Sequence, residues 1–433
     1  KKICTFAASY FQILSMYWQG LEKRRNRIKK PFFTIMLITT IQNGEILRLN
    51  CSKSILIRQL VLEALYGEVL PMPNADDSED VWVVYRALTI IKQNYNKSFH
   101  NIDNDFIKID VKDCGAGYRF LMAVAAVTPG RWLLTGTKRL LERPILPLVD
   151  TLKSADADIE PCAEGWKIRG KELHARALTI DCSQSSQLAS ALLLAGDRLR
   201  LQELTVVPTP PPSAPYWELT RRMVEARRQG LPVRREADWS TAAFWYAFLA
   251  ADITIDTLTL KDLHLDSLQG DAVVAEWFRG FGIRSEQTTE GVTICRDKTN
   301  CNPVENNTFH LYNHPDLAPV MAVTALLGQR TVTLTGLGNL NRKESRRMDL
   351  LCELLSHFCS LQRQDDETLT VDGTSFTTNS ESIIFNPQND HRMAMAAALL
   401  SLHFPIVVTD IDCVKKSYPQ FQKYFISDPK NQK

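Results

Sequence analysis

The chain has 433 residues, more than one ordinary hydrophobic core holds, so two large domains or more are expected. Its content of 45% hydrophobic and 23% charged residues is typical of a globular protein and excludes a disordered or fibrous one. A formal net charge of +2 provides no global reason to expect a nucleic acid partner, and none is predicted.

Ten cysteines are scattered along the chain without a C-x-x-C pair or the spacing of a metal site. This pattern is typical of reduced, mostly buried thiols, so we expect a cytoplasmic protein. The eight histidines form no ligand cluster in the sequence, and no metal is expected. The sequence also lacks a Walker loop, a dinucleotide-binding fingerprint and a Ser/His/Asp order.

Residues 1–31 differ from the rest of the chain, because residues 3–18 are largely apolar and residues 22–30 are strongly basic. The apolar run is short for a membrane span, and a cleaved signal would place its charge before the apolar run. We therefore expect an extension outside the fold, a first domain that starts near Met36, and no membrane association.

Residues 32–51 predict a pair of strands joined at a turn, because residues 43–44 are the hairpin dipeptide Asn-Gly. Residues 52–54 then open a helix with a serine cap and a lysine, and Arg58 follows one turn later. This set suits a phosphate or carboxylate, although an ordinary capped helix is the simpler interpretation of the fragment alone. Residues 77–81 are expected only to cap the next helix.

A unit of strand, polar elbow, alanine- or leucine-rich helix and second strand recurs along the chain, which favours an α/β fold built of repeats. Its elbows lie 55 to 76 residues apart, at Ser52, Cys114, Cys182, Ala237, Asn313 and Asn389. Any α/β protein alternates strands and helices, but six small or polar elbows favour a true repeat. Six units suit two domains of three units each.

In the first half of the chain, Gly115 and Gly117 form a short elbow that lets a ligand approach the backbone closely. Arg143 precedes Pro144, so its backbone is expected to be extended and its side chain can point into a cleft. Residues 185–187 are Ser-Ser-Gln, which offers neutral donors and acceptors at a helix N-terminus.

In the second half, Lys343 and Arg347 are four positions apart, which predicts one shared helical face with Glu344 beside them. Such a basic cluster is usually solvated helix surface. However, Asp316 opens the neighbouring unit, and residues 389–392 place an arginine at a helix N-terminus where an anion is favoured. The combined pattern predicts a cleft with about eight cations and two carboxylates, suited to small polyanions and proton transfer.

Together these motifs resemble the EPSP synthase family, whose activity is that of a 3-phosphoshikimate 1-carboxyvinyltransferase. The matching residues run in the family's order from about residue 36 to the end of the chain: residues 52–54 with Arg58, 115–119, 135–144, 185–187, 343–347, 389–395 and 413–419. The resemblance implies a two-domain inside-out α/β barrel, each domain with three βαβαββ repeats. One domain would comprise residues 52–236. The other would be discontinuous, from residues 32–51 plus 237–433.

The resemblance implies transfer of the enolpyruvyl group of phosphoenolpyruvate to the 5-hydroxyl of shikimate 3-phosphate, with release of phosphate. This step belongs to the shikimate pathway, which leads to chorismate and the aromatic amino acids. It needs no metal or organic cofactor, and we expect a monomer whose partners are the two small anionic substrates.

Each functional residue of the family is carried over to the matching position here. Shikimate 3-phosphate would be held by Ser54, Arg58, Ser185, Ser186, Gln187, Ser213, Tyr216, Asp316, Asn339 and Lys343. Phosphoenolpyruvate would be held by Lys53, Gly115, Arg143, Gln187, Arg347, Arg392 and Lys416. Lys53, Asp316 and Glu344 would be catalytic, with Asp316 the base for the 5-hydroxyl and Glu344 the acid that protonates the methylene carbon.

Four positions depart from the family pattern: Ile57 and Asp113 stand where asparagine is usual, Ala116 where threonine is usual and Arg346 where an acid is usual. Asp113 would bring an anionic side chain near the phosphoenolpyruvate pocket, and Arg346 would disturb the pairing of Glu344 with its neighbours. None of the four removes a residue assigned to chemistry, so we expect activity with altered affinity.

Two alternatives remain open. An enolpyruvyl transferase acting on UDP-N-acetylglucosamine shares the fold, but it is expected to have Lys-Asn at residues 53–54 and a reactive loop cysteine. A catalytically impaired member that acts as a binding protein is the other alternative. The intact acids and cations of the predicted site argue against it.

Overall fold

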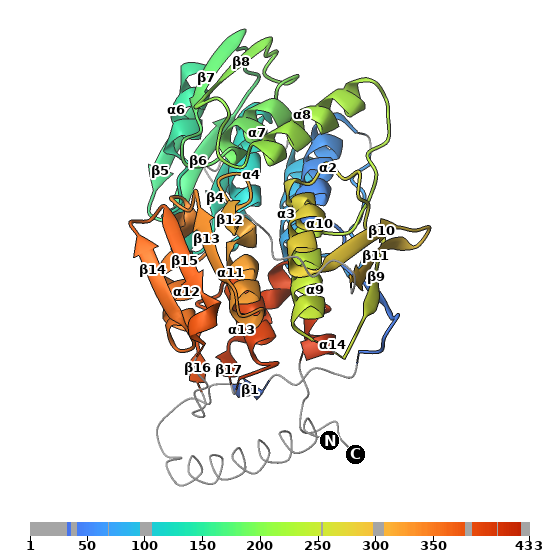
Figure 1. The fold of residues 1–433 in the computed structure, drawn as a ribbon. Helices are drawn as coiled ribbons and strands as arrows, with labels where there is room; N and C mark the ends of the chain where they lie inside the picture. The colour runs from blue at the N-terminus through green and yellow to red at the C-terminus, as the bar shows by residue number, and fades with distance from the viewer. Residues whose placement is uncertain are drawn as a thin grey trace, which may run out of the picture.

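The computed structural model describes residues 33–35, 41–67, 69–95, 106–252, 254–297, 307–376, 383–404 and 406–425. The predicted extension at residues 1–31 and the predicted start near Met36 lie outside these ranges. Figure 1 shows two halves, one above the other. We call them the upper half, from α2 (Lys53–Tyr66) to α8 (Ala214–Arg228), and the lower half, which comprises β1 (Phe33–Ile35), β2 (Ile46–Arg48) and the elements from α9 (Trp239–Ala251) to α14 (Phe421–Phe425).

The upper half alternates helices and strands. Between its first and last helix lie α3 (Glu79–Asn94), β3 (Ile107–Asp110), α4 (Gly115–Val127), β4 (Gly130–Thr135), α5 (Lys138–Leu141), α6 (Leu146–Ser154), β5 (Asp158–Cys162), β6 (Gly165–Gly170), β7 (Ala177–Asp181), α7 (Gln187–Leu194) and β8 (Glu203–Val207). Four strands form a sheet in the order β3-β4-β6-β5, and β7 pairs with β8 in parallel. In the sheet, β3 and β4 are parallel and the other neighbours are antiparallel.

The lower half also contains both helices and strands. After α9 come β9 (Thr257–Lys261), η2 (Gly270–Val273), α10 (Val274–Trp277), η3 (Phe278–Phe281), β10 (Ile283–Gln287), β11 (Gly291–Arg296), β12 (Thr308–His310), η4 (Pro315–Leu317), α11 (Ala318–Leu327), β13 (Thr331–Thr335), η5 (Leu340–Arg342), α12 (Arg347–Ser356), β14 (Ser360–Gln364), β15 (Thr368–Asp372), η6 (Gly373–Ser375), β16 (Ile383–Phe385), α13 (His391–Leu400), β17 (Ile406–Thr409) and η7 (Ile411–Lys416). Its sheets have the orders β10-β11-β9-β2, β12-β13-β15-β14 and β1-β17-β16.

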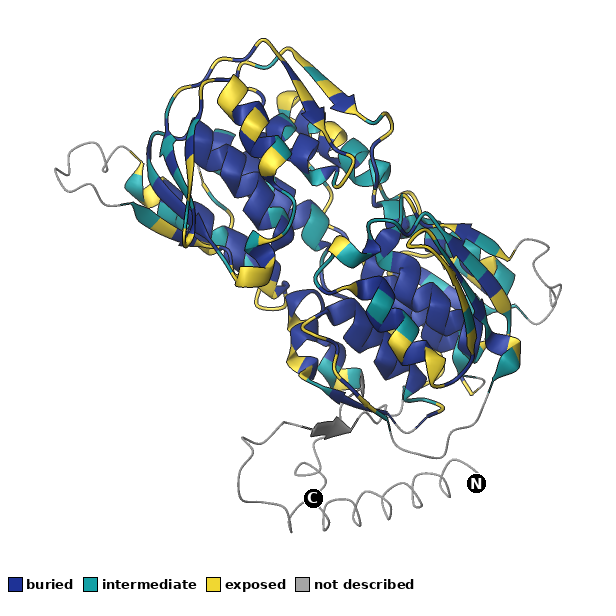
Figure 2. Ribbon diagram, turned by 90° about the vertical axis from the view of Figure 1, so that its left-hand side faces the viewer, coloured by how far each residue is buried: buried dark blue, intermediate teal, exposed yellow. Residues whose placement is uncertain are grey.

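Each half surrounds a group of central helices with its sheets and its other helices, as Figure 2 shows by the dark blue of the central helices. Every residue of α13 is buried, and so is nearly every residue of α4 and α9. A helix that is apolar on all sides must be surrounded by protein, so these alanine-rich segments become the core. The strands β9 and β15 alternate between buried and partly exposed residues, as expected of strands that cover a core.

The six predicted elbows are confirmed, because each is followed by a helix: α2, α4, α7, α9, α11 and α13. The buried apolar residues form two separate clusters, one in each half. The predicted inside-out α/β barrel in two domains is therefore the fold. Among the described residues, no helix is both long and apolar enough to cross a lipid bilayer.

The chain passes between the halves twice, and the two crossings lie side by side. Ser52 N donates to Glu236 O at 2.9 Å, and Asp238 N donates to Asn50 O at 3.1 Å. These contacts support our proposal of a discontinuous lower domain with boundaries at residues 51/52 and 236/237.

The predicted strand pair within residues 32–51 is wrong. β1 pairs with β17, whereas β2 pairs with β9 in a different sheet. The Asn43-Gly44 turn does not close a hairpin, because Asn43 Oδ1 accepts from the backbone N–H of Asp256 and Thr257, each at 2.9 Å. The turn therefore docks on the start of β9, and long-range pairing overrides the local signal.

Candidate active site

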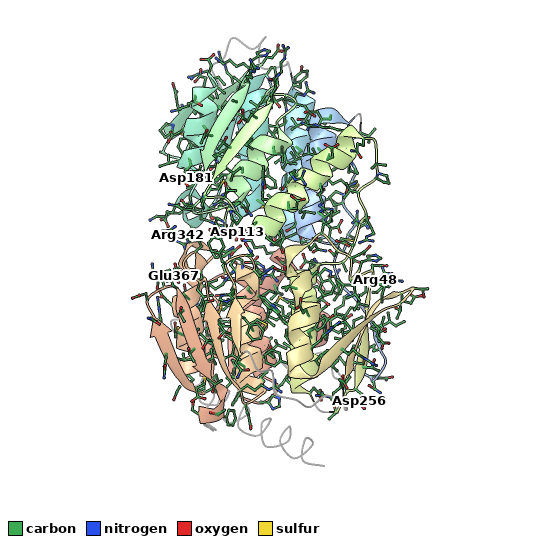
Figure 3. The ribbon with its side chains drawn as sticks, turned by 45° about the horizontal axis from the view of Figure 1, so that its top comes forward. Arg48, Asp113, Asp181, Asp256, Arg342 and Glu367 are labelled. Carbon is green, nitrogen blue, oxygen red and sulfur yellow. The ribbon has the colours of Figure 1, made fainter. Side chains whose placement is uncertain are left out.

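A cavity of about 380 Å³ lies between the upper and lower halves, and both halves contribute to its wall. Most of the predicted site residues line it: Lys53, Ser54, Arg58, Gly115, Arg143, Ser185, Ser186, Gln187, Ser213, Tyr216, Asp316, Asn339, Lys343 and Glu344. The other three, Arg347, Arg392 and Lys416, are buried and contact carboxylates at or beside this wall. In Figure 3, the labelled Asp113 and Arg342 mark the level at which the halves meet.

The wall carries more acids than predicted. Within the described residues, its cations are Lys53, Arg58, Arg119, Arg143, Arg342 and Lys343, and its carboxylates are Asp80, Asp316, Glu344 and Glu367. The expectation of about eight cations and two carboxylates is therefore wrong. Cations in a poorly solvated cavity need counter-ions, and the protein supplies several of its own.

Lys53 begins α2 and bridges the two halves. Its Nζ donates to Ser417 Oγ of the lower half at 2.6 Å and lies 3.1 Å from Asp80 Oδ2 of the upper half. The prediction that residues 77–81 only cap α3 is therefore wrong, because Ser78 makes no side-chain capping hydrogen bond and Asp80 is a counter-ion at the site. In the sequence, Asp80 stands in the first turn of a helix, where acidic residues are common, so nothing there predicted its contact with Lys53.

Arg58 is buried at the upper wall and is hydrogen-bonded within the upper half. It donates to Thr220 Oγ1 at 2.6 Å, to Ser54 O at 2.7 Å and to Tyr216 O at 3.2 Å. Burial lowers the pKa of Arg58 to about 10, so it stays cationic at neutral pH. Ser52, expected to cap α2, makes no side-chain capping hydrogen bond.

Gly115 gives Arg143 room at the cavity. A Cβ atom at residue 115 would lie 2.3 Å from Arg143 Nη1, so a larger residue there requires the guanidinium to move. Arg143 lies outside any helix, as predicted, but in the bend after α5, where its N–H donates to Leu140 O at 3.0 Å, and not in the extended segment expected before proline. Its buried Nε has no hydrogen-bond partner among the described residues.

Arg119 was not assigned to the site from the sequence, although it lines the cavity. Its Nη1 donates to Gly115 O at 2.9 Å and to Gln187 Oε1 at 3.2 Å. Burial, reinforced by the neighbouring Arg143, lowers the pKa of Arg119 to about 9. An arginine one turn after a glycine elbow was the available signal.

Asp316 and Glu344 share one guanidinium at the lower wall. Arg347 Nη1 donates to Asp316 Oδ1 at 2.8 Å, and Nη2 donates to Glu344 Oε2 at 2.7 Å. Arg347 also donates to Asp390 from Nε at 2.9 Å and from Nη2 at 3.2 Å. An anionic substrate would therefore compete with three carboxylates for this residue.

Lys343 and Arg347 both reach Asp316, but the predicted shared helical face is wrong. Lys343 follows η5 with an extended backbone, and α12 begins only at Arg347. Lys343 Nζ lies 3.5 Å from Asp316 Oδ1. Burial acts to raise the pKa of Asp316, but Lys343, Arg347 and Arg392 outweigh it and hold that pKa well below its usual range. Asp316 is therefore a carboxylate at neutral pH.

Glu344 has the same protonation state. Burial acts to raise its pKa, but Arg347, Arg143 and Lys416 outweigh burial and hold the pKa well below its usual range. A general acid must carry a proton, so these cations oppose the predicted role unless a bound anion offsets them.

The N-terminus of α13, predicted to attract an anion, is capped by a carboxylate of the chain itself. Asp390 accepts from the backbone N–H of Arg392 at 3.0 Å and of Met393 at 3.4 Å. The Arg392 side chain is 2% exposed, and its Nη2 lies 3.9 Å from Asp316 Oδ2. Among the described residues, its buried Nε and Nη1 have no hydrogen-bond partner, so they can still donate to an anion.

His391, also at the start of α13, joins this network. His391 Nε2 lies 2.9 Å from Ser417 Oγ, the hydroxyl that accepts from Lys53. Burial, together with the charges of Lys53 and Arg392, holds the pKa of His391 well below its usual range, so the ring is neutral at pH 7.

One side of the cavity, which we call the neutral side, is lined by the uncharged residues Ser213, Asn339 and 185–187, and hydrogen bonds connect the two halves there as well. Ser213 has a left-handed backbone, with φ +57°, and its N–H donates to Tyr312 O at 3.1 Å. Asn339 Nδ2 donates to Ser183 O at 3.3 Å, close to residues 185–187 at the start of α7. The neutral polar side chains at the cavity thus come from both halves.

Arg346 does not disturb the acid pair as predicted. It is exposed and pairs with Asp349 at 2.5 Å, while Arg347 keeps its 2.7 Å contact with Glu344. Of the other departures, Ile57 and Ala116 line the cavity.

Comparison with known proteins places this geometry in a family. Residues 38–425 match the family model described as EPSP synthase (3-phosphoshikimate 1-carboxyvinyltransferase). The chain is 32% identical to the 3-phosphoshikimate 1-carboxyvinyltransferase of Bacteroides fragilis, over 87% of this chain and 93% of that protein. It is 30% identical to the protein of that name from Pyrococcus abyssi, over 72% and 77%.

A solved structure of EPSP synthase from Acinetobacter baumannii has a similar fold. It superposes with a TM-score of 0.63 at 17% identity and covers 90% of this chain and 97% of that one. A second structure from the same organism has a TM-score of 0.60 at 16% identity.

Proposed function

Because the chain belongs to the EPSP synthase (3-phosphoshikimate 1-carboxyvinyltransferase) family, we propose that it transfers the enolpyruvyl group of phosphoenolpyruvate to the 5-hydroxyl of shikimate 3-phosphate. One observation carries the proposal: two carboxylates, Asp316 and Glu344, share Arg347 at a cavity lined by cations from both halves. Two anionic substrates and two proton transfers need such a set of groups.

The substrates occupy different parts of the cavity in this proposal. Shikimate 3-phosphate lies along the neutral side, with its phosphate near Arg58 and Lys343 and its hydroxyls near residues 185–187 and Asn339. Phosphoenolpyruvate lies against Lys53, Arg143 and the buried cations of the lower half. The donors of Arg143 and Arg392 that lack partners among the described residues support this assignment.

The reaction proceeds by addition and then elimination. Asp316 accepts the proton of the 5-hydroxyl, and Glu344 donates a proton to the methylene carbon of phosphoenolpyruvate. The 5-oxygen then bonds to the adjacent carbon, which becomes tetrahedral. Loss of phosphate, with return of one proton from the new methyl group to the Glu344 carboxylate, restores the double bond. Lys53 stabilises the negative charge that grows on the departing phosphate.

Substrate binding makes Glu344 able to act as the acid. The cations that lower its pKa are the groups assigned to phosphoenolpyruvate, namely Arg143, Arg347 and Lys416. Negative charge from the substrate offsets those cations and thereby raises the pKa of Glu344. The halves of one chain complete the cavity, which supports a monomer as the active form.

Phosphate release tests the proposal. Purified protein is given shikimate 3-phosphate and phosphoenolpyruvate together, and each is omitted in turn. We expect phosphate only when both are present. Absence of release from folded protein would contradict the proposal, and UDP-N-acetylglucosamine would then test the alternative acceptor. Binding of both substrates without turnover would indicate the impaired family member.

A further inference from the structure

Asp113 lies at the level where the two halves meet (Figure 3), two positions before Gly115, which lines the cavity. It lies just before α4 in the upper half, and its Oδ2 accepts from two residues of the lower half. Lys416 Nζ donates to it at 2.8 Å and Asn389 Nδ2 at 2.9 Å. Lys416 Nζ also donates to the backbone O of Asp113 at 3.1 Å. One residue thus offers this ammonium group both a neutral and a charged acceptor.

The burial of the two partners differs. The Lys416 side chain is 5% exposed and the Asp113 side chain is 28% exposed. A buried ammonium group needs a counter-ion, whereas a partly exposed carboxylate can turn into water at modest cost. Because the backbone carbonyl also accepts from Lys416, the ammonium group keeps a hydrogen-bond partner when the Asp113 carboxylate leaves.

We propose that Asp113 determines the affinity for phosphoenolpyruvate, because its carboxylate occupies the place on Lys416 that an anionic group of the substrate takes in the complex. This inference rests on the proposed function, which assigns Lys416 to phosphoenolpyruvate. Binding then exchanges one anion for another at the same ammonium group. Part of the substrate's interaction with Lys416 is offset by the loss of the Asp113 contact, so the affinity is lower than an uncharged acceptor would allow.

The substitution Asp113→Asn tests this directly, because the amide oxygen can still accept from Lys416 while the charge is removed. Calorimetric titration with phosphoenolpyruvate alone, so that no turnover contributes heat, should show about tenfold tighter binding by the variant than by the natural protein. The KM for phosphoenolpyruvate should fall by a similar factor, whereas the KM for shikimate 3-phosphate should change less than about twofold. The difference between the proteins should shrink as sodium chloride is raised, because salt screens the competing charge.

Asp110→Asn is the matched control, since it removes one negative charge three positions away. The Asp110 side chain is 39% exposed and pairs with Lys112, which does not line the cavity. Its phosphoenolpyruvate affinity should equal that of the natural protein. An effect as large as that of Asp113→Asn would show that net charge, not competition at Lys416, sets the affinity.

Unchanged or weaker phosphoenolpyruvate binding by Asp113→Asn would overturn the inference, since Asp113 would then only hold Lys416 in place. Absence of phosphoenolpyruvate binding in both proteins would also overturn it. Failure of the proposed function is distinguishable, because it appears as absent phosphate release by the natural protein. Calorimetry still compares anion affinity in that case.

Discussion

At the scale of single residues, Glu344 faces opposing demands. Three nearby cations keep it a carboxylate, yet the proposed chemistry needs it to deliver a proton. Asp316 has no such conflict, because a base must be deprotonated before it can accept the hydroxyl proton, and its pKa is well below its usual range. Because Arg347 contacts both acids, negative charge that a substrate brings to Arg347 should raise the pKa of Asp316 and of Glu344 together.

The substitution Glu344→Gln tests the acid. An amide of similar shape cannot donate the proton to carbon, so kcat should fall by about 100-fold or more while the affinity for shikimate 3-phosphate stays within about threefold. Steady-state phosphate release measures kcat, and calorimetry measures binding. The matched control is Glu367→Gln, because Glu367 lines the same cavity without an assigned role. A near-normal rate for Glu344→Gln would remove Glu344 from the mechanism.

Gly115 lies against the Arg143 guanidinium at the cavity wall. In Gly115→Ala the new Cβ displaces the Arg143 guanidinium, a flexible group, so folding should be little affected. We expect the KM for phosphoenolpyruvate to rise about tenfold, because loss of one charge-assisted contact costs about 1.5 kcal/mol or more. The KM for shikimate 3-phosphate serves as the internal control. Equal changes in both constants would contradict a local effect on Arg143.

At the scale of elements, the N-terminus of α13 shows how one carboxylate can organise several segments. Asp390 is fully buried, caps α13, accepts from Ser345 Oγ at 2.9 Å and pairs with Arg347 of α12. The cap also orients the helix that carries Arg392. Two helices of the lower half, α12 and α13, and the bend before α12 thus depend on one side chain.

Asp390→Ala should lower the free energy of unfolding by about 3–5 kcal/mol, because it leaves the buried Arg347 short of a counter-ion and removes a helix cap. Urea unfolding followed by circular dichroism measures this. In the control Asp412→Ala, the lost carboxylate is 75% exposed and forms an ion pair with the exposed Lys415, so little change is expected. A loss below about 1 kcal/mol in Asp390→Ala would mean that Asp316 and Glu344 suffice for Arg347.

At the scale of the whole molecule, the burial of Glu344 and His391 beside cations makes the free energy of unfolding depend on pH. The folded pKa of Glu344 lies well below 4.5 and that of His391 well below 6.5. Both groups therefore bind protons more readily in the unfolded chain. Each contributes stability that is present above its unfolded pKa and is lost as the pH falls below that value.

The free energy of unfolding should thus decline slightly from pH 7 to 5 and more steeply below pH 4.5. Glu344→Gln should make the decline below pH 4 shallower by up to about 1.4 kcal/mol per pH unit, the contribution of one carboxylate. Urea unfolding at a series of pH values measures the slope. Glu367→Gln should leave it unchanged, and an equal slope in all three proteins would contradict the assignment.

Much of this molecule could be predicted from local patterns. Small or polar elbows before alanine-rich segments marked the starts of six helices, because helix propensity, capping and all-round apolar character act within one or two turns. Four of the elbows, at Ser52, Cys114, Cys182 and Asn313, are followed closely by residues of the cavity wall, and the resemblance of the motifs along the chain identified the family. The prediction that Lys343 and Arg347 share a helical face was wrong because a spacing of four has that meaning only within a helix. Lys343 lies in the bend before α12, which begins at Arg347.

The sequence by itself therefore determined the helices, their inward place in the fold and the cations at their ends. Only the tertiary structure decided strand partners and counter-ions, for example β1 with β17, Asp80 with Lys53 and Asp113 with Lys416. The last two pairs join residues 27 and 303 positions apart. The physical reason is that helix formation is a local equilibrium, whereas pairing of charges and strand edges depends on which distant segments folding brings within about 3 Å.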